Sequence, residues 1–367
     1  MSPHRPFLSV IVPAHEAQSV LPDTLGALRR SDLPKEEWEL IVIDDASRDR
    51  TALVAAEYAD TVVHLTGAAH GPAFARNRGS EVSRGDVLVF VDADVRVHPS
   101  SLGQFAETFR THPDLGAVFG SYDDQPPAPG VLSRYRNLLH HYHHHRGAGD
   151  AGTFWAGLGA VRADVFMEVG KYDEWRYQRP QIEDIELGRR IVHAGHRILL
   201  DPTIQGTHLK GWILRDILFG DLFDRGIPWM TLMLREGGGG GQLNVKTKEK
   251  VCVTLVGVAC TTPVLALSLG RWEVLGLIPV LLVTITALNA DLYRFMYRGR
   301  GVGFLLAAIP LHLTYYFVSG LAAVLGHLAH WRDREPQPTA RARELSERGG
   351  ESWPPVPERP RSSNRDR

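Results

Sequence analysis

Two aspartates separated by one residue, Asp92 and Asp94, directly follow an apolar run at residues 87–91. The run is typical of a strand buried on both faces, as in a parallel sheet. Open α/β sheets bind ligands at the carboxyl ends of their strands, where this pair is expected to lie. Two carboxylates at this spacing can share one hard divalent cation, and such a cation indicates a bound diphosphate. The alternative is a simple polar turn, because aspartate is common in turns.

The same succession of a strand and polar residues recurs earlier in the chain. Apolar runs at residues 7–12, 40–43 and 62–65 also predict strands, and segments with helical spacing lie between them. Strands that alternate with helices form right-handed βαβ units, so these strands are expected in one parallel sheet. Their carboxyl ends meet at one edge, which is the predicted nucleotide site.

Composition limits the classes of function and the compartment. The chain has 367 residues and a formal net charge of -1, which gives no general basic field for nucleic-acid binding. Its two cysteines, Cys252 and Cys260, lie in one apolar segment. No disulfide framework is therefore expected, and a reducing compartment is favoured for the soluble part. Residues 1–6 lack the apolar core of a signal peptide.

Four short motifs occur in order at the predicted strand ends and helix starts. They lie at residues 10–16 (VIVPAHE), 42–47 (VIDDAS), 73–79 (AFARNRG) and 90–94 (FVDAD). Together they resemble the ordered motifs of glycosyltransferase family 2, and the resemblance extends to about Trp229. It implies the GT-A fold, a mostly parallel α/β sheet flanked by helices. It also implies inverting transfer of a sugar from a nucleotide-sugar donor.

The resemblance implies roles for residues at these motifs and beyond them. The residues expected to bind the nucleotide sugar are Pro13, Ala14, Glu16, Asp44, Asp45, Arg76, Asp92, Trp155, Gly157 and Lys210. Asp92 and Asp94 resemble the DXD pair that holds Mn²⁺ or Mg²⁺ on the diphosphate, with His208 as a third ligand. Glu16 would lie near the ribose, and Asp45 would bind the base. The alternatives are a helix cap at Asp44 and Asp45, a solvated Arg76, and ordinary sheet packing for Trp155.

Glu183 and Asp184 lie at the start of a segment with helical spacing. Carboxylates at a helix start gain from the helix dipole, which explains the pair without a catalytic role. The resemblance instead implies that Asp184 is the general base, supported by Glu183, and takes a proton from an acceptor hydroxyl. An acceptor that is already ionised, such as a polyprenyl phosphate, needs no base, and Asp184 would then only position groups.

Two further stretches bear on the substrate. A run of histidines at residues 140–145 permits a metal site, but no carboxylate or cysteine joins it in sequence. We favour a pH-sensitive, acceptor-facing or membrane-proximal surface there. Trp212 stands where processive polysaccharide synthases of the wider family carry a Gln-x-x-Arg-Trp motif. The glutamine and the arginine are missing here, which argues against a processive synthase.

The C-terminal part predicts attachment to a membrane. Residues 251–270 and 274–290 are long and apolar enough to span a bilayer. Basic residues on both outer flanks place the catalytic domain in the cytoplasm by the positive-inside rule. Residues 302–329 would cross once or form a bent hairpin. The amphipathic residues 212–234 would lie in the membrane interface or pack against the catalytic domain.

These features divide the chain into a catalytic domain at residues 1–235, a flexible linker at 236–250, a transmembrane region at 251–330 and a disordered tail at 331–367. The expected protein is a multi-pass glycosyltransferase of the inner (plasma) membrane. Its donor would be UDP- or GDP-linked, and its acceptor a lipid or a polyprenyl-phosphate-linked molecule. Two alternatives are a polysaccharide synthase subunit coupled to export and a non-catalytic nucleotide-sugar sensor. The sequence leaves the oligomeric state open.

Overall fold

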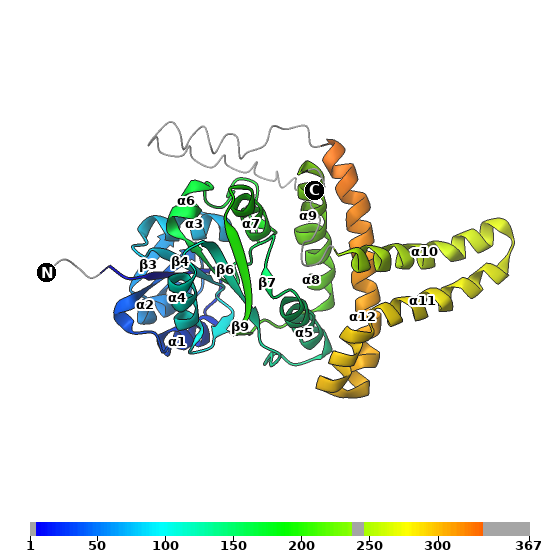
Figure 1. Cartoon of the computed structure of the whole chain (residues 1–367), viewed down its shortest axis with the longest axis horizontal. Helices are drawn as coiled ribbons and strands as arrows, with labels where there is room; N and C mark the ends of the chain where they lie inside the picture. The colour runs from blue at the N-terminus through cyan, green and yellow to red at the C-terminus, as the bar shows by residue number, and fades with distance from the viewer. Residues whose placement is uncertain (1–4, 237–245, 333–367) are drawn as a thin grey trace, which may run out of the picture.

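The computed structural model describes residues 5–236 and 246–332. Within them, one sheet of nine strands forms the centre of the N-terminal part (Figure 1). Eight strands follow the order β3-β2-β1-β4-β8-β6-β9-β5, and β7 pairs with β9. The strands are β1 (Leu8–Ala14), β2 (Trp38–Asp45), β3 (Thr61–Leu65), β4 (Val87–Val91), β5 (Val95–Val97), β6 (Leu115–Tyr122), β7 (Gly149–Asp150), β8 (Leu158–Arg162) and β9 (Arg197–His208).

The sheet is mixed. β1 pairs in parallel with β2 and β4, and β2 with β3, as the alternation of strands and helices predicts. β8 lies between β4 and β6 and is antiparallel to both, while β5 and β7 are antiparallel to β9. The predicted α/β sheet with flanking helices is confirmed. The antiparallel strands come from segments that are very short or rich in small residues, so strand periodicity does not reveal them.

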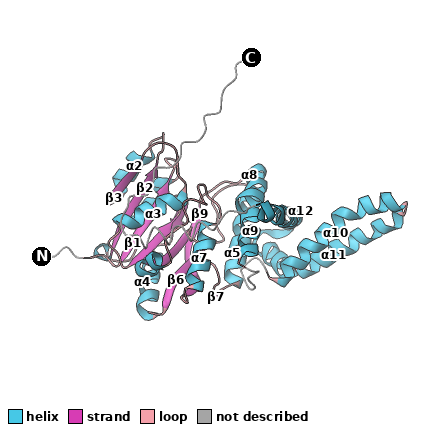
Figure 2. Cartoon of the chain, turned by 90° about the horizontal axis from the view of Figure 1, so that it is seen from above, coloured by secondary structure: helices cyan, strands magenta, loops and turns pink. Residues whose placement is uncertain are grey.

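Helices cover both faces of the sheet (Figure 2). One layer consists of α1 (Leu21–Arg29), α2 (Thr51–Tyr58) and α4 (Ser101–Thr111), and the other of α3 (Pro72–Val82), α6 (Ala163–Glu168) and α7 (Glu183–His193). A short 3-10 helix, η1 (Lys35–Glu37), precedes β2. Side chains alternate along β1, so Val10 and Val12 belong to the first core and Ile11 to the second.

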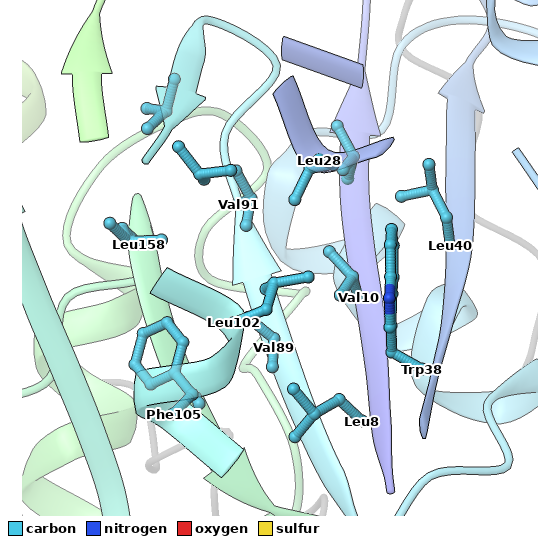
Figure 3. Packing of buried hydrophobic residues seen from close by; sticks show 14 of the residues in the cluster. Leu8, Val10, Leu28, Trp38, Leu40, Val89, Val91, Leu102, Phe105 and Leu158 are labelled. Carbon is cyan, nitrogen blue, oxygen red and sulfur yellow. The ribbon is translucent and has the colours of Figure 1, made fainter. Parts of the chain in front are cut away.

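Figure 3 shows the first of these two cores. Leu8 and Val10 of β1 and Val89 of β4 share it with Leu28 of α1 and Phe105 of α4. All five side chains are fully buried. Burial of each contributes about 1.5–3 kcal/mol. This core therefore holds β1 and β4, whose carboxyl ends carry predicted site residues.

The start of α3 depends on one glycine. Gly71 has a φ of 96°, in the region that favours glycine. A Cβ atom at this position would lie 2.5 Å from the backbone oxygen of Gln178. The N–H of Gly71 donates a hydrogen bond to Oδ2 of Asp45 at 2.8 Å. The end of β2 thus fixes the start of the helix that carries Arg76.

The remaining helices lie beside the sheet and beyond it. They are α5 (Val131–Arg146), α8 (Leu214–Phe219), the π-helix η2 (Gly220–Gly226), α9 (Ile227–Arg235), α10 (Thr247–Leu269), η3 (Trp272–Gly276), α11 (Leu277–Leu288) and α12 (Ala290–Arg332). α10 and α11 project from the molecule as a hairpin, and α12 runs crosswise to them along α8 and α9 (Figures 1 and 2). Among the described residues, α10 and α12 are long and apolar enough to cross a membrane.

The predicted C-terminal segments lie partly within the residues that the structure describes. Residues 302–329 form one helix after the non-helical Gly301, so the structure shows no hairpin there. Residues 247–250, expected within the flexible linker, form the first turn of α10. Residues 237–245, and the expected disordered tail from residue 333 onward, lie outside the described residues.

Candidate active site

The carboxyl ends of β1, β2 and β4 bring predicted site residues to one edge of the sheet. Ala14 is the register partner of Asp44, and Pro13 precedes it on β1. Asp92 directly follows β4, and its N–H donates to the backbone oxygen of Gly157 at 3.1 Å. The strand-end residues of the expected donor site therefore meet a segment that lies much later in the chain.

Arg76 joins this edge to α7. Its Nη2 donates to Oδ1 of Asp92 at 2.7 Å, and its Nη1 donates to Oε1 of Glu183 at 2.9 Å. Arg76 and Glu183 are almost fully buried, whereas 34% of the Asp92 side chain is exposed. Burial opposes the positive charge, but the neighbouring carboxylates raise the pKa of Arg76 above its ordinary value. Arg76 is thus a buried, charged link and not a solvated helix residue.

Asp184 lies beside this network at the start of α7. Its Oδ2 accepts a hydrogen bond from the N–H of Ala156 at 3.1 Å, and its Oδ1 accepts one from the N–H of Ile185 at 2.8 Å. Burial, together with the negative charge of Glu183, raises the pKa of Asp184 to about 7. A carboxylate with this pKa can accept a proton near neutral pH. Glu183 instead binds Arg76, which makes it a positioning residue.

Asp94 and His208 form a second pair. The antiparallel ladder of β5 and β9 makes Val95 the register partner of His208. Nε2 of His208 consequently lies 3.6 Å from Oδ2 of Asp94. Burial works against a charged carboxylate, but the imidazole of His208 and the charge of Lys210 hold the pKa of Asp94 below its usual value. The carboxylate of Asp94 is therefore negatively charged at neutral pH.

The expected metal ligands fit a cation only in part. Among the described residues, no group of three or more His, Cys, Asp or Glu side chains is arranged to hold a metal ion. Oδ1 of Asp92 is bound by Arg76, while 27% of the Asp94 side chain is exposed. Mg²⁺ commonly binds through one or two carboxylates together with phosphate oxygens of a substrate, and Mn²⁺ suits the same oxygen ligands. Asp94 and His208, with Asp92 nearby, fit a metal that arrives with its diphosphate.

Glu16, Asp44 and Asp45, which are expected around the nucleoside, form hydrogen bonds with residues of neighbouring loops. Glu16 has a φ of 50°, an uncommon conformation that is frequent at functional sites. Both carboxylate oxygens of Asp45 accept hydrogen bonds from the N–H of His70. Neither Asp44 nor Asp45 caps α2, because Asp49 accepts the hydrogen bond from the first N–H of that helix. The alternative that these two aspartates cap the following helix, α2, therefore does not hold.

Aromatic rings surround Trp155. Its ring centroid lies 4.8 Å from that of Tyr122 and 4.7 Å from that of His140. The ring of Tyr122 stacks on His208 at 4.4 Å. A Cβ atom on Gly157 would lie 2.4 Å from the Trp155 ring, so any larger residue there would have to displace the ring. The stack connects the expected floor of the sugar site to the Asp94–His208 pair.

Part of the histidine run belongs to this stack. The rings of His140 and His144 lie 3.8 Å apart, and Nδ1 of His144 lies 2.9 Å from the backbone oxygen of Gly120. Burial lowers the pKa of both histidines, that of His144 to about 3. Both are therefore neutral at pH 7, and the expectation of a pH-sensitive surface is wrong for these two residues.

Three cations surround Trp212 next to His208. The ring centroid lies 4.4 Å from Nζ of Lys210, 5.7 Å from the guanidinium of Arg136 and 6.0 Å from that of Arg225. Both arginines also pair with Asp221. Sequence reasoning identified only Lys210, because Arg136 and Arg225 lie among apolar residues of amphipathic helices. Only the packing of these helices brings the cations together, and their charges suit phosphate oxygens.

Comparison with known proteins shows what this chain is similar to. Residues 9–170 match the family model of Glycosyl transferase family 2. The probable glycosyltransferase YdaM of Bacillus subtilis is 26% identical over 211 residues, which cover 54% of this chain and 49% of YdaM. Validoxylamine A glucosyltransferase of Streptomyces hygroscopicus subsp. limoneus is 33% identical over 138 residues, covering 35% of this chain and 30% of that protein. The chain thus spans half the length of these relatives or less.

A solved structure shares the fold. It is the mannosyltransferase PcManGT of Pyrobaculum calidifontis in complex with GDP-Man and Mn²⁺, with 18% sequence identity and a TM-score of 0.52. The alignment covers 90% of this chain and 88% of that protein. The predicted GT-A-like architecture is therefore confirmed, and the family match extends over residues 9–170.

Proposed function

The chain carries a glycosyl transferase family 2 domain in residues 9–170, and we propose that it is an inverting, metal-dependent glycosyltransferase. It transfers a sugar from a UDP- or GDP-linked donor to a lipid or lipid-linked acceptor. The glycosyltransferase names of its relatives support the reaction class. The GDP-Man bound to the solved mannosyltransferase supports a nucleotide-sugar donor.

The observation that carries the proposal is the position of Asp184 beside the Arg76 network. A carboxylate whose pKa is about 7 lies at the same edge as Asp92, which the network holds in place. The N–H groups of Ala156 and Ile185 orient the Asp184 carboxylate, and burial together with the charge of Glu183 keeps its affinity for a proton high. Removal of a proton from a hydroxyl group requires an oriented base whose pKa is close to 7.

In the proposed reaction, Asp184 accepts the proton of the acceptor hydroxyl as that oxygen attacks the anomeric carbon. The new carbon–oxygen bond forms on the face opposite the leaving group, so the configuration inverts. The bond from the anomeric carbon to the diphosphate oxygen breaks, and its electron pair leaves with the nucleoside diphosphate. Lys210, near Asp94, would meet the charge that grows on the diphosphate.

Asp94 and His208, with Asp92 nearby, would hold the divalent cation. When bound, Mn²⁺ or Mg²⁺ supplies a positive charge that stabilises the leaving diphosphate. The Mn²⁺ in the complex of the solved mannosyltransferase supports a divalent metal.

Membrane attachment supports a lipid acceptor. Apolar side chains such as Val264, Leu267, Val280 and Val283 are exposed on the α10–α11 hairpin. Apolar surface of this kind is stable in a lipid environment, and basic residues flank the hairpin at its base. We therefore propose an inner-membrane protein with its catalytic domain in the cytoplasm. If the acceptor is an ionised lipid phosphate, Asp184 positions it instead of deprotonating it.

The test uses the full chain in a neutral detergent with Mn²⁺ and a panel of UDP- and GDP-sugars. Nucleotide release is measured first, and membrane lipid extracts are then searched for sugar label from the active donor. Asp184→Asn is compared with Asp164→Asn. Asp164 makes the same hydrogen bond to the following N–H at 2.8 Å, but on α6. We expect the wild type and Asp164→Asn to release nucleotide, and Asp184→Asn to release none.

Other outcomes lead to different functions. Donor binding without nucleotide release would contradict an enzyme and favour a nucleotide-sugar sensor. A long polymer as the labelled product would contradict single transfer and favour a synthase coupled to export. Full activity of Asp184→Asn with an acceptor that bears a neutral hydroxyl would exclude Asp184 as the base.

A further inference from the structure

A groove of about 520 Å³ lies between the end of α5 and the first part of α12. Tyr142 and Arg146 line it from α5, and Asp291, Arg294, Phe295 and Arg298 line it from α12. None of these residues belongs to the proposed sugar-transfer site. The groove is therefore a separate feature of the molecule.

The groove carries a net positive charge. Three of its lining side chains are arginines, and Asp291 is the one carboxylate among its lining residues. The Asp291 carboxylate forms ion pairs with two of these arginines, because its oxygens lie 3.0 Å from Nη1 of Arg294 and 3.9 Å from Nη2 of Arg146. All three of these side chains are more than half exposed. Guanidinium groups that are accessible and only partly neutralised favour an anion with several oxygens.

The walls of the groove are held in place from beneath. A buried cluster of Tyr135, Leu139, Leu292, Tyr293 and Met296 packs α5 against the start of α12. On the groove side, the rings of Tyr142 and Phe295 lie 5.5 Å apart. The spacing of the arginines is therefore set by packed helices and does not depend on a loop.

The groove lies between two strongly apolar segments. α11 ends just before it, and the second part of α12 begins after Gly301. The exposed side chains of Val302, Leu306, Phe317 and Leu321 recur at helical spacing along that second part. Because α12 runs crosswise to the α10–α11 hairpin (Figure 1), a hairpin that crosses a bilayer places α12 along the membrane surface. The arginines then lie at the depth of the lipid head groups, where basic and aromatic residues are typical.

We infer that this groove binds the phosphate head group of an anionic membrane phospholipid. Arg294 and Arg298 would contact the phosphate oxygens, and Tyr142 and Phe295 would contact the glycerol and the start of the acyl chains. A lipid is favoured over a free phosphate because the apolar face of α12 continues from the groove. The inference depends on the proposed membrane attachment, but not on the donor, the metal or the acceptor.

The experiment uses the purified full chain in a neutral detergent. Binding of dioleoyl phosphatidylglycerol, dioleoyl phosphatidylcholine and glycerol 3-phosphate is titrated by native mass spectrometry. The variant Arg294→Gln/Arg298→Gln is compared with Arg271→Gln/Arg332→Gln, which removes the same charge from exposed sites at the tip of the hairpin and the end of α12. Arg294→Lys/Arg298→Lys keeps the charge, and thermal unfolding without lipid establishes that each variant is folded.

We expect saturable binding of phosphatidylglycerol by the wild type, with much weaker binding of phosphatidylcholine and glycerol 3-phosphate. Removal of both groove arginines should weaken phosphatidylglycerol binding roughly twenty-five-fold, since each basic residue near an anionic surface contributes about fivefold. The distant double variant and the lysine variant should bind within about threefold of the wild type, by the same reasoning on charge. Equal losses in the groove and distant variants would overturn the inference, and so would equally tight binding of glycerol 3-phosphate.

Nucleotide release from a soluble donor, measured on the same variants, keeps this inference apart from the proposed function. Unchanged release with lost lipid binding supports a separate lipid site. Lipid binding that persists in the groove variant while release is lost would overturn it, because the arginines would then serve the reaction and not the lipid.

Discussion

Arg76 and Glu183 form a buried ion pair although 107 residues separate them in the chain, with 2.9 Å between Nη1 and Oε1. The pair joins α3 to the start of α7. Through its second nitrogen, Arg76 also holds Asp92 at the end of β4. One side chain thus fixes the relative positions of a proposed metal-proximal carboxylate and the residue before the proposed base.

Arg76→Gln should destabilise the fold as well as abolish transfer. It leaves Glu183 buried without its cation, and loss of one partner of a buried pair costs about 3–5 kcal/mol. The control is Arg110→Gln, which breaks the exposed pair with Glu37 and should cost less than about 1 kcal/mol. Thermal or urea unfolding measures both. Equal small losses in the two variants would show that the Arg76 network does not stabilise the domain.

The pH dependence of transfer should report the titration of Asp184. Its pKa of about 7 predicts that kcat/KM rises about tenfold per pH unit below neutrality and then levels off, because the base must be unprotonated. Asp184→Asn should be slower by at least about a hundredfold and should lack this inflection. Rates from pH 5 to pH 9 test both points. An inflection near pH 7 that persists in the variant belongs to another group.

Stability should also depend on Asp184. Between its ordinary pKa of 3.8 and its raised value of about 7, the folded state holds a proton that the unfolded state has lost. The contribution of this carboxyl group to the free energy of unfolding is therefore fully present below pH 3.8 and is lost as pH rises through about 7. The melting temperature of Asp184→Asn should therefore rise relative to that of the wild type as the pH increases from 5 to 8. A constant difference across this range contradicts the raised pKa.

The nucleotide should strengthen metal binding. Because Asp94 and His208 supply few ligands, Mn²⁺ should bind weakly alone and more tightly with a nucleoside diphosphate, as calorimetry would measure. EDTA should abolish transfer, and added Mn²⁺ should restore it. Asp94→Asn and His208→Ala should raise the Mn²⁺ requirement at least about tenfold, whereas the exposed Asp86→Asn should not. Tight Mn²⁺ binding without nucleotide would contradict the partial site.

The contact between Gly157 and Trp155 should limit substitution at position 157. A methyl group there would lie 2.4 Å from the Trp155 ring and displace it, at a cost of about 1–3 kcal/mol. Gly157→Ala should therefore lower kcat/KM and change tryptophan fluorescence. Gly152→Ala is the matched control, since its added Cβ would have its nearest neighbour, Arg189, 4.0 Å away. Full activity of Gly157→Ala would remove the Trp155 floor from the proposal.

Local patterns were sufficient for much of the fold. The parallel strands β1 to β4 follow from apolar runs that end in polar residues, because that pattern is carried by neighbouring residues. β5, with three residues, and β7, with two, were not predicted, since such short segments have no periodicity to detect. Yet β5 is the strand whose ladder with β9 sets Asp94 opposite His208.

The sequence by itself determined the family-like motifs of residues 10–94, the residue types of the candidate site and the apolar C-terminal helices, because motif order and hydropathy are properties of the linear chain. Only the tertiary structure decided which of these residues meet. It buried Arg76 between two carboxylates, placed His140 and His144 against Trp155, and gathered Arg136 and Arg225 around Trp212. Burial and charge proximity, which set pKa values and ion pairs, arise from contacts between segments far apart in sequence.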